Sequence, residues 1–493
     1  MTSVLSEPQP APPSLRERVA KGALWSLIGQ VLGQGLTMAA SVVAARLLGD
    51  IGYGEYGIIT STVGGFGVFA GLGLGATAIK YIAENRDKDP ERAGRIVVLC
   101  NRVAVISGLL TGVALLLTAP ALASSTLHAP HLANVLRLSS GLLVFNALMG
   151  SLSGVLAGLE TYRTLAGIAF WRGLVAFPLM ILGGWAYGLW GLVLGTVLAS
   201  AAGWLLTQRA VNVECRKAAL PLTGHQLSQE MQVLWNFSLP ACLIGVVTTP
   251  VIWACNALLV NQPGGYSQMG ILNAATQIRS AAMFIPAAIF QPLLPILCHE
   301  LNREDQSAGS LRLHIINAYA TWFLATSATA ILLYLAGPIM WLFGPDFVAG
   351  KFALVLVLCS IPLMTYKDGI GRLIHAKGLI WMSFGSNVLL AVVLLAATYV
   401  LAPQGAVGLG YAYLIAYAVN VVVMVPLFLR KLGMVRVLGM DALLAVLLGL
   451  ALIPGVLSNA LGLGLGLQIV SALLTLGMLL AAAWLLHRWL AAA

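Results

Sequence analysis

Long apolar runs separated by short polar connections make up almost the whole chain. Many of these runs reach the ~20 residues that a helix needs to cross a hydrocarbon core about 30 Å thick. They are too long for the strands of a membrane barrel, which take about ten residues each. We therefore predict about fourteen membrane-spanning helices. The predicted spans are residues 23–48, 57–79, 96–118, 135–159, 164–186, 189–211, 233–259, 268–297, 313–336, 352–374, 380–401, 407–429, 437–457 and 463–486.

The composition requires lipid as the solvent for most of the chain. Of the 493 residues, 59% are hydrophobic and 9% are charged, whereas about 25% of an ordinary soluble domain is charged. In lipid the backbone must satisfy its own hydrogen bonds, so long apolar runs become helices and the fold class is an all-α polytopic membrane protein. The polar residues 1–20, which end in a basic cluster, predict a cytoplasmic tail before a true first span and not a cleaved signal peptide.

The net charge of +10 reflects membrane topology and not a nucleic-acid partner, because the basic residues occupy alternate connections. With the N-terminus inside, the inner connections hold residues such as Arg86, Arg209 and Lys377, whereas the outer connections hold Lys351. The excess of Lys and Arg on one side predicts that both termini lie in the cytoplasm.

Matching residue pairs at a nearly constant offset indicate an internal repeat. They are Leu24-Trp25 with Leu234-Trp235, Gly52-Tyr53 with Gly265-Tyr266, and Asn85-Arg86 with Asn302-Arg303. Each half would hold six spans, an even number, so the halves would be parallel repeats with a substrate site at their interface. The expected organisation is a tail over 1–20, an N-lobe over 21–217, a C-lobe over 218–431 and two extra spans over 432–493.

Two motifs carry a family resemblance. One is the stretch from Arg46-Leu47-Leu48-Gly49 to Glu55-Tyr56-Gly57, which runs on to Lys80-Tyr81-Ile82-Ala83-Glu84; the other is Leu342-Phe343-Gly344-Pro345-Asp346-Phe347. With the repeat and the span count, the chain resembles the polysaccharide-transport branch (O-antigen and exopolysaccharide flippases) of the multidrug/oligosaccharidyl-lipid/polysaccharide exporter superfamily.

The resemblance implies a V-shaped two-lobe transporter with the last two helices outside its core. It implies a flippase that moves an undecaprenyl-diphosphate-linked oligosaccharide from the inner to the outer leaflet of the bacterial inner (plasma) membrane for surface polysaccharide biosynthesis. Its partners would be the lipid-linked oligosaccharide, membrane lipids, a polysaccharide polymerase and chain-length proteins, and no cofactor would be needed.

Four cations fall inside predicted spans: Arg102, Arg172, Arg279 and Lys367. A charge at the bilayer centre costs about 2.5–3.5 kcal/mol, so such a residue is a functional hypothesis by default. Their excess over acids suits a diphosphate, because a guanidinium matches phosphate oxygens with two parallel hydrogen bonds. We expect these cations to line a substrate cavity. A buried interhelical bond for Arg172 and snorkelling of Arg102 to the inner surface are the alternatives.

Polar residues at helical spacing extend this expectation. Arg279 belongs to a polar arc on span eight, and span one carries a polar stripe that includes Ser41. The polar residues expected to face the cavity, or otherwise to hydrogen-bond between helices, are Gln30, Gln34, Asn236, Asn273 and Gln277. Asp368 and Arg372 are four residues apart on one helix face, so we expect them to form an ion pair.

Other functions compete less well with these residues. Asp87-Lys88-Asp89 could hold the metal of a glycosyltransferase, but its connection is too short for a nucleotide-binding domain, and no phosphate-binding loop motif occurs. We therefore expect neither an enzyme nor a bound metal. The serious alternatives are a cation-coupled multidrug exporter of the same superfamily, which would use embedded carboxylates, and a peptidoglycan lipid II flippase.

Overall fold

The computed structural model describes residues 15–224, 227–290, 315–377, 379–432 and 437–492. Helices make up nearly all of these residues, and no strand occurs among them. The first part of the chain forms α1 (Leu15–Gly71), α2 (Leu74–Asn85), α3 (Pro90–Ala121), η1 (Leu122–Thr126), η2 (Pro130–Leu132), α4 (Ala133–Gly158), α5 (Tyr162–Lys217), α6 (Leu227–Val233), η3 (Leu234–Ser238), α7 (Leu239–Val260) and α8 (Gly265–Phe290). The remainder forms η4 (Ile315–Ala320), α11 (Thr321–Tyr334), α12 (Ala336–Phe343), η5 (Pro345–Gly350), α13 (Lys351–Ala376), α14 (Ile380–Leu401), η6 (Ala402–Gln404), α15 (Gly405–Leu432), α16 (Leu438–Ala460) and α17 (Leu465–Ala492).

Nine helical segments of the described chain are long and apolar enough to cross a membrane. Three of them, Val31–Asn85, Tyr162–Lys217 and Trp381–Lys431, contain 55, 56 and 51 residues, more than twice the ~20 that one crossing takes. The all-helical membrane fold predicted from the sequence is therefore confirmed. The count of about fourteen spans and the division into lobes stay predictions, since part of span eight and of span nine lies outside the described residues.

The long segments fold back on themselves at glycines. In α5 the helical geometry fails at Tyr187 and Gly188, and beyond this turn Gly191 packs against Gly183 so closely that a Cβ on either would lie within 2.2 Å of the other's carbonyl oxygen. In α1 the break is at Gly49, where φ is 70° and ψ is −177°. Only glycine adopts this left-handed backbone without strain, so both turns depend on it.

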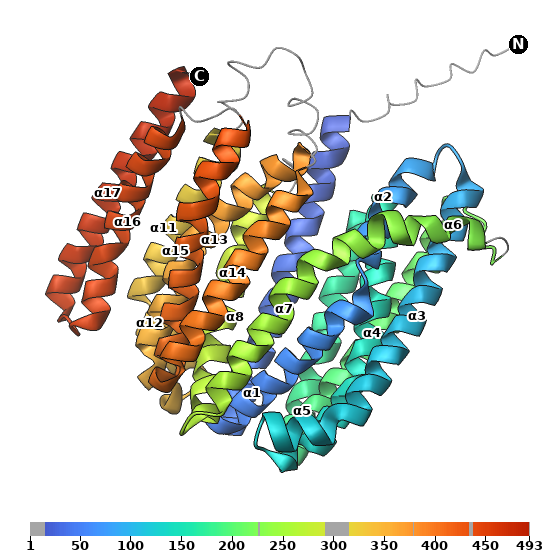
Figure 1. Ribbon diagram of the computed structural model, residues 1–493, viewed down its shortest axis with the longest axis horizontal. Helices are drawn as coiled ribbons and strands as arrows, with labels where there is room; N and C mark the ends of the chain where they lie inside the picture. The colour runs from blue at the N-terminus through green and yellow to red at the C-terminus, as the bar shows by residue number, and fades with distance from the viewer. Residues whose placement is uncertain (1–14, 225–226, 291–314, 378, 433–436, 493) are drawn as a thin grey trace, which may run out of the picture.

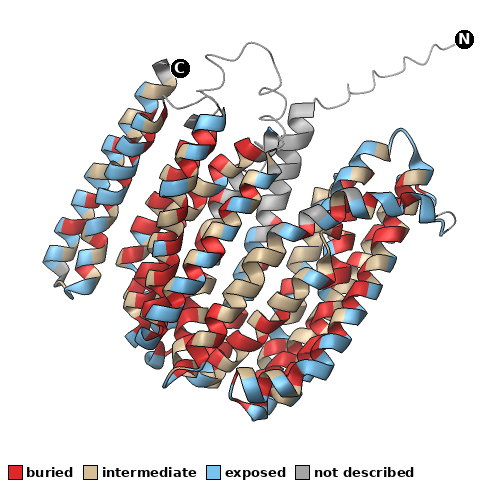
Figure 2. Ribbon diagram, viewed as in Figure 1, coloured by how far each residue is buried: buried red, intermediate tan, exposed pale blue. Residues whose placement is uncertain are grey.

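The distribution of buried and exposed residues fits a helical bundle whose outer surface is surrounded by lipid. Buried residues follow the inward faces of the helices, and exposed residues follow the outer faces (Figure 2). Large apolar side chains are among the most exposed, with Leu117 at 70% and Val422 at 72%. A water-soluble protein rarely exposes large contiguous apolar patches, so this surface fits the acyl chains of a bilayer.

The two halves of the bundle meet at one end and diverge toward the other (Figure 1). The first turns of α1 and the last turns of α17 lie at the same, divergent end, and α16 with α17 stands at the edge of the bundle (Figure 1). One apolar cluster joins the halves, since it contains Tyr53 of α1, Met269 of α8 and Phe347 of η5.

Candidate functional site

A chamber of about 360 Å³ lies among α7, α13, α14 and α15. Its polar wall is formed by Lys367 and Asp368 of α13, Asn387 of α14, and Tyr413 and Tyr417 of α15, and the remaining wall is mostly apolar. We call it the C-half chamber. Its volume falls within the range of about 300–1,000 Å³ that is typical of small-ligand pockets.

Arg279 of α8 lies against this chamber through one of its wall residues. Its guanidinium carbon is 4.7 Å from the centroid of the Tyr413 ring, so the cation stacks on the aromatic face. The Nη1 nitrogen is buried and has no hydrogen-bond partner among the described residues. No carboxylate in the described part of the chain lies within 4.0 Å of Arg279. The positive charge is thus held by an aromatic ring and not by an acid.

Lys367 and Asp368 put opposite charges into the chamber wall. Lys367 Nζ donates to Asn387 Oδ1 at 2.8 Å, which fixes the ammonium group between α13 and α14. Asp368 is exposed, and it lines the chamber. The described lining thus holds one cation and one anion, and Arg279 adds a second cation behind the Tyr413 ring.

Arg372 does not form the ion pair with Asp368 that their spacing predicted. Its Nε donates to Asn317 Oδ1 at 2.7 Å, and its Nη2 donates to the Asn317 carbonyl oxygen at 3.1 Å and to Thr321 Oγ1 at 3.2 Å. No Arg372–Asp368 contact within 4.0 Å occurs, although both side chains are described. The physical reason is that η4 and α11 offer Arg372 three aligned acceptors. This leaves the Asp368 carboxylate directed to the chamber.

The polar faces predicted on spans one and eight meet at the junction of the two halves. Gln277 Nε2 donates to Ser41 Oγ at 3.3 Å, and Ser41 also bonds to the hydroxyl of Tyr53. Asn273 packs directly against the backbone at Gly57, because Gly57 has no side chain. A Cβ added to Gly57 would come within 3.1 Å of Asn273 Cγ. Gln277 and Ser41 therefore hydrogen-bond between α8 and α1, and Asn273 packs against α1. That these residues face a substrate cavity stays a prediction.

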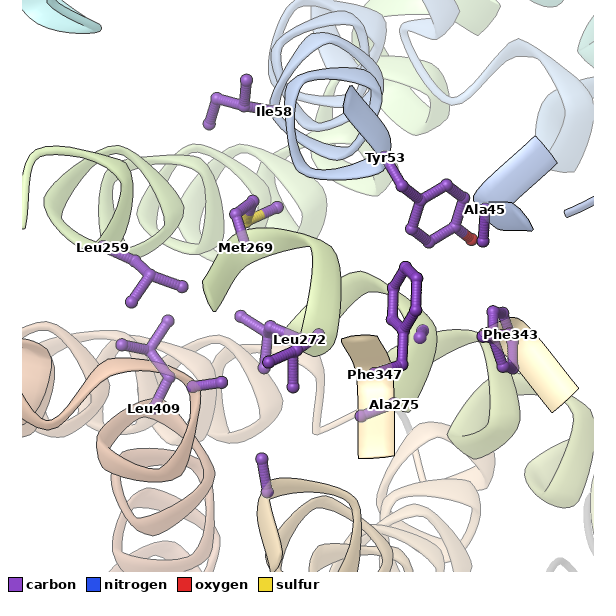
Figure 3. Close-up of a cluster of buried hydrophobic side chains, with 14 of the residues drawn as sticks. Ala45, Tyr53, Ile58, Leu259, Met269, Leu272, Ala275, Phe343, Phe347 and Leu409 are labelled. Atoms are coloured by element: carbon purple, nitrogen blue, oxygen red, sulfur yellow. The ribbon is translucent and has the colours of Figure 1, made fainter. Parts of the chain in front are cut away.

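Several further contacts join the two halves at one end of the bundle, and we call this region the closed end. Arg46 Nε donates to the Leu342 carbonyl oxygen at 2.7 Å, and Asp50 accepts a hydrogen bond from Ser267. Tyr266 Oη donates to the Leu127 carbonyl oxygen at 2.8 Å. Figure 3 shows Tyr53 of α1 beside the rings of Phe343 and Phe347, which seal the same region with apolar surface.

The other predicted cations lie away from the C-half chamber. Arg172 is exposed on α5 and runs across Gly203 on the returning half of the same helix, where a Cβ would come within 3.1 Å of its Cδ. Arg102 is exposed on α3, and its Nη2 lies close to Gly224 in the segment after α5. Its snorkelling to the inner surface stays a prediction.

The remaining predicted residues belong to span one and span seven. Gln34 is half-buried on α1. The side chains of Gln30 and Asn236 lie outside the described part of the structure.

Two features of the site escaped the sequence analysis. Tyr413 and Tyr417 form the wall beside Arg279, and their spacing of four residues on one helix face was the available signal. Asp441 near the start of α16 is 6% exposed and lies against Tyr319 and Tyr366, so Asp368 is not the only acid within the helical bundle. Asp441 sits within the first turn of a predicted span, which is where its burial could have been suspected.

Comparison with known proteins identifies the family. The sequence profile of the family described as "Polysaccharide biosynthesis protein" matches residues 19–299, which is more than half of the chain. The chain belongs to this family. The match confirms the resemblance that the sequence motifs indicated. The chain is also 23% identical over 430 residues to the EPS I polysaccharide export inner membrane protein EpsE of Ralstonia nicotianae, covering 83% of this chain and 93% of the relative.

Solved structures show the same fold in members of the exporter superfamily. An inward-facing multidrug resistance MATE family transporter of the MOP superfamily superposes with a TM-score of 0.64 at 16% identity, over 84% of this chain and 99% of the other. An outward-facing MATE family structure gives a TM-score of 0.57 at 15% identity, over 85% and 96%. At such identities the likeness concerns the fold alone, and this polysaccharide biosynthesis family member shares it along most of its length.

Proposed function

We propose that the protein is a flippase that moves a polyprenyl-diphosphate-linked oligosaccharide across the bacterial inner membrane for surface polysaccharide export. The family match, the polysaccharide export relative and the transporter fold support a transporter of polysaccharide precursors. Arg279 would engage the diphosphate, and Lys367 would contribute further positive potential from the wall of the C-half chamber. No catalytic step and no cofactor are part of this proposal.

The buried Nη1 nitrogen of Arg279 carries the proposal. A guanidinium nitrogen that is buried without an acceptor is costly, because a charged donor loses its hydration without replacement. The Tyr413 ring, 4.7 Å from the guanidinium carbon, holds the cation, while Nη1 has no partner among the described residues. A diphosphate supplies oxygen acceptors at the fork spacing of a guanidinium, so substrate binding would offset the cost. A cationic drug offers Arg279 no such acceptor.

The test is delivery of glycan lipid to the outer leaflet at matched protein level. Arg279→Ala should abolish delivery while leaving the protein inserted, and Arg279→Lys should recover it only in part, because the planar fork is lost. Arg172→Ala should cause a milder loss. Supplying lipid II and a surface-polysaccharide precursor in parallel decides which glycan is carried. Full delivery by Arg279→Ala would falsify the cationic-site mechanism.

A cation-coupled multidrug exporter is the second candidate, and Asp368 is the observation that favours it. Its carboxylate faces the chamber without the Arg372 partner expected from the sequence. Embedded carboxylates of this kind are suited to binding a coupling ion. If Asp368→Asn removes a measured proton or sodium dependence of transport, Asp368 is the coupling site. If the variant also loses resistance to cationic drugs while glycan delivery persists, the exporter is the correct function.

A further inference from the structure

Span two is broken in its middle. α1 ends at Gly71, the chain turns through Leu72 and Gly73 with φ values of 44° and 67°, and α2 begins at Leu74. Such a break leaves backbone carbonyls at the end of one helix and backbone amides at the start of the next without helical partners. In a membrane these groups must find partners in the protein or in a wet cavity.

The carbonyl side of the break is satisfied by three neighbouring side chains. Ser107 Oγ donates to the Ala70 carbonyl oxygen at 2.7 Å, and Ser238 Oγ donates to that of Leu72 at 2.7 Å. Cys242 Sγ lies 3.5 Å from the Val68 carbonyl oxygen. Elements α3, η3 and α7 thus each direct one donor at the end of α1.

The amide side is left open. The cap residue Gly73 has no side chain to accept a hydrogen bond, and the amides of Leu74, Gly75 and Ala76 donate to no acceptor among the described residues. These are the first three amides of a 12-residue helix, and they carry the positive end of its dipole. A helix start of this kind accepts anions such as phosphate.

These amides border a cavity of about 290 Å³ between α1, α2, α4 and α7, which we call the span-two cavity. None of its described lining residues is charged, and several are glycines. A Cβ added to Gly71 or to Gly150 would meet no atom within 4 Å, so both face open space. The carboxamide of Asn146 also lines the cavity and is exposed to it.

Ser151 places a buried hydroxyl without a partner at the wall of the span-two cavity. Its side chain lines the cavity and is 1% exposed, yet its Oγ has no hydrogen-bond partner among the described residues. Ser139 and Ser140 on the same helix donate to carbonyl oxygens three residues earlier, at 2.8 and 2.7 Å. A buried hydroxyl that does not bond to its own helix is available to an acceptor in the cavity.

We propose that the span-two cavity binds a phosphate-type oxyanion through the first amides of α2, the Ser151 hydroxyl and the Asn146 carboxamide. Every one of these groups donates hydrogen bonds, the helix end is positive, and no carboxylate among the lining residues opposes an anion. Given the proposed function, the diphosphate of the glycan lipid is one source of such a group. A phospholipid headgroup is the other. The site is separate from Arg279 and the C-half chamber, and it requires no charged side chain.

Binding of inorganic diphosphate to the purified full chain tests the site directly. In a maltoside detergent, which contains no phosphate, the ³¹P resonance of diphosphate should broaden saturably as protein is added. Gly150→Leu fills the cavity where a Cβ is unobstructed and should abolish binding. Ser151→Ala should weaken binding at least about fivefold without lowering thermal stability, because no internal hydrogen bond is lost. Ser140→Ala, whose hydroxyl bonds its own helix, is the matched control and should bind normally.

The lipid environment distinguishes the two sources of phosphate. In phosphatidylglycerol nanodiscs, loss of diphosphate binding identifies the headgroup as the occupant, whereas retained binding identifies the glycan-lipid diphosphate. No saturable binding in maltoside, or unchanged binding by both Gly150→Leu and Ser151→Ala, overturns the site. If diphosphate binding is lost in Arg279→Ala but kept in Gly150→Leu, the anion binds at the C-half chamber and not in the span-two cavity. The proposed function then still holds. Normal glycan delivery by Arg279→Ala, with binding still sensitive to Gly150→Leu, defeats the cationic-site mechanism and supports this site.

Discussion

Gly54 on α1 lies directly against the backbone of Tyr266 on α8. A Cβ on Gly54 would come within 1.8 Å of the Tyr266 carbonyl oxygen, and one on Gly270 within 2.0 Å of the Asp50 carbonyl oxygen. Facing glycines thus let a helix of one half touch a helix of the other by backbone alone, as small residues do between membrane helices. The closed end depends on this contact, because any side chain at either position forces the helices apart.

Gly54→Ala should weaken the closed end, whereas Gly64→Ala should not. Both positions are helical glycines of α1, but a Cβ at Gly64 would meet nothing within 4 Å. Alanine at Gly64 should therefore be neutral or stabilise by up to about 1 kcal/mol through helix propensity. Thermal unfolding in detergent compares the two variants, and solvent labelling of Ser267→Cys in each background reports opening. Equal stability and equal labelling would contradict the role of the glycine contact.

Arg46 should act as a latch across the closed end. Its guanidinium donates to the carbonyl oxygens of Leu342 and Trp341 at 2.7 and 3.2 Å and lies 5.2 Å from the Trp341 ring centroid. Because the side chain is exposed, we expect Arg46→Gln to shift the closed–open equilibrium by only about 1 kcal/mol. Hydrogen exchange of the peptide covering α12 should become faster. Unchanged exchange there would mean that Arg46 serves packing alone.

The partner of Arg372 can be measured with double-mutant cycles. Asn317 is fully buried and accepts from Arg372 Nε at 2.7 Å, while its own amide donates to the Gly369 carbonyl oxygen at 2.6 Å. Arg372→Ala should lower the free energy of unfolding by about 1.5–3 kcal/mol, since Asn317 Oδ1 loses a charged donor. The Arg372–Asn317 cycle should show coupling, and the Arg372–Asp368 cycle should show little. The reverse result would restore the ion pair expected from the sequence.

The orientation of the chain is open to a direct test with fused reporters. The structure puts the start of α1 and the end of α17 at one end of the bundle, and the distribution of basic residues predicts that this end is cytoplasmic. Reporters fused after Glu84 and Lys377 should read cytoplasmic, and those after Gly264 and Gly405 should read external. Inversion of one pair alone would show that the predicted span count is wrong.

The sequence predicted the class of molecule because hydropathy is a local property. The length of the apolar runs gave helices and the need for lipid, and turns such as Gly49 and Gly188 fell between predicted spans. Motifs near Arg46 and Leu342 gave the family. The cations inside the spans were also visible, since a charge within an apolar run needs no tertiary information to be recognised.

Tertiary structure decided what each of those charges contacts. The four-residue spacing of Asp368 and Arg372 establishes a shared helix face, but the helix packed on that face supplied Asn317 as the better-aligned acceptor. Arg279 likewise found the ring of Tyr413, which is more than a hundred residues away in sequence. The open amides of α2 beside Ser151 could not be foreseen from the sequence. Hydropathy does not show that span two is broken, nor that distant helices cap the carbonyls at the break and leave its amides without acceptors. Contacts between helices depend on which helix faces pack together. Local sequence periodicity shows which residues share a face, but it does not determine which other helix that face contacts.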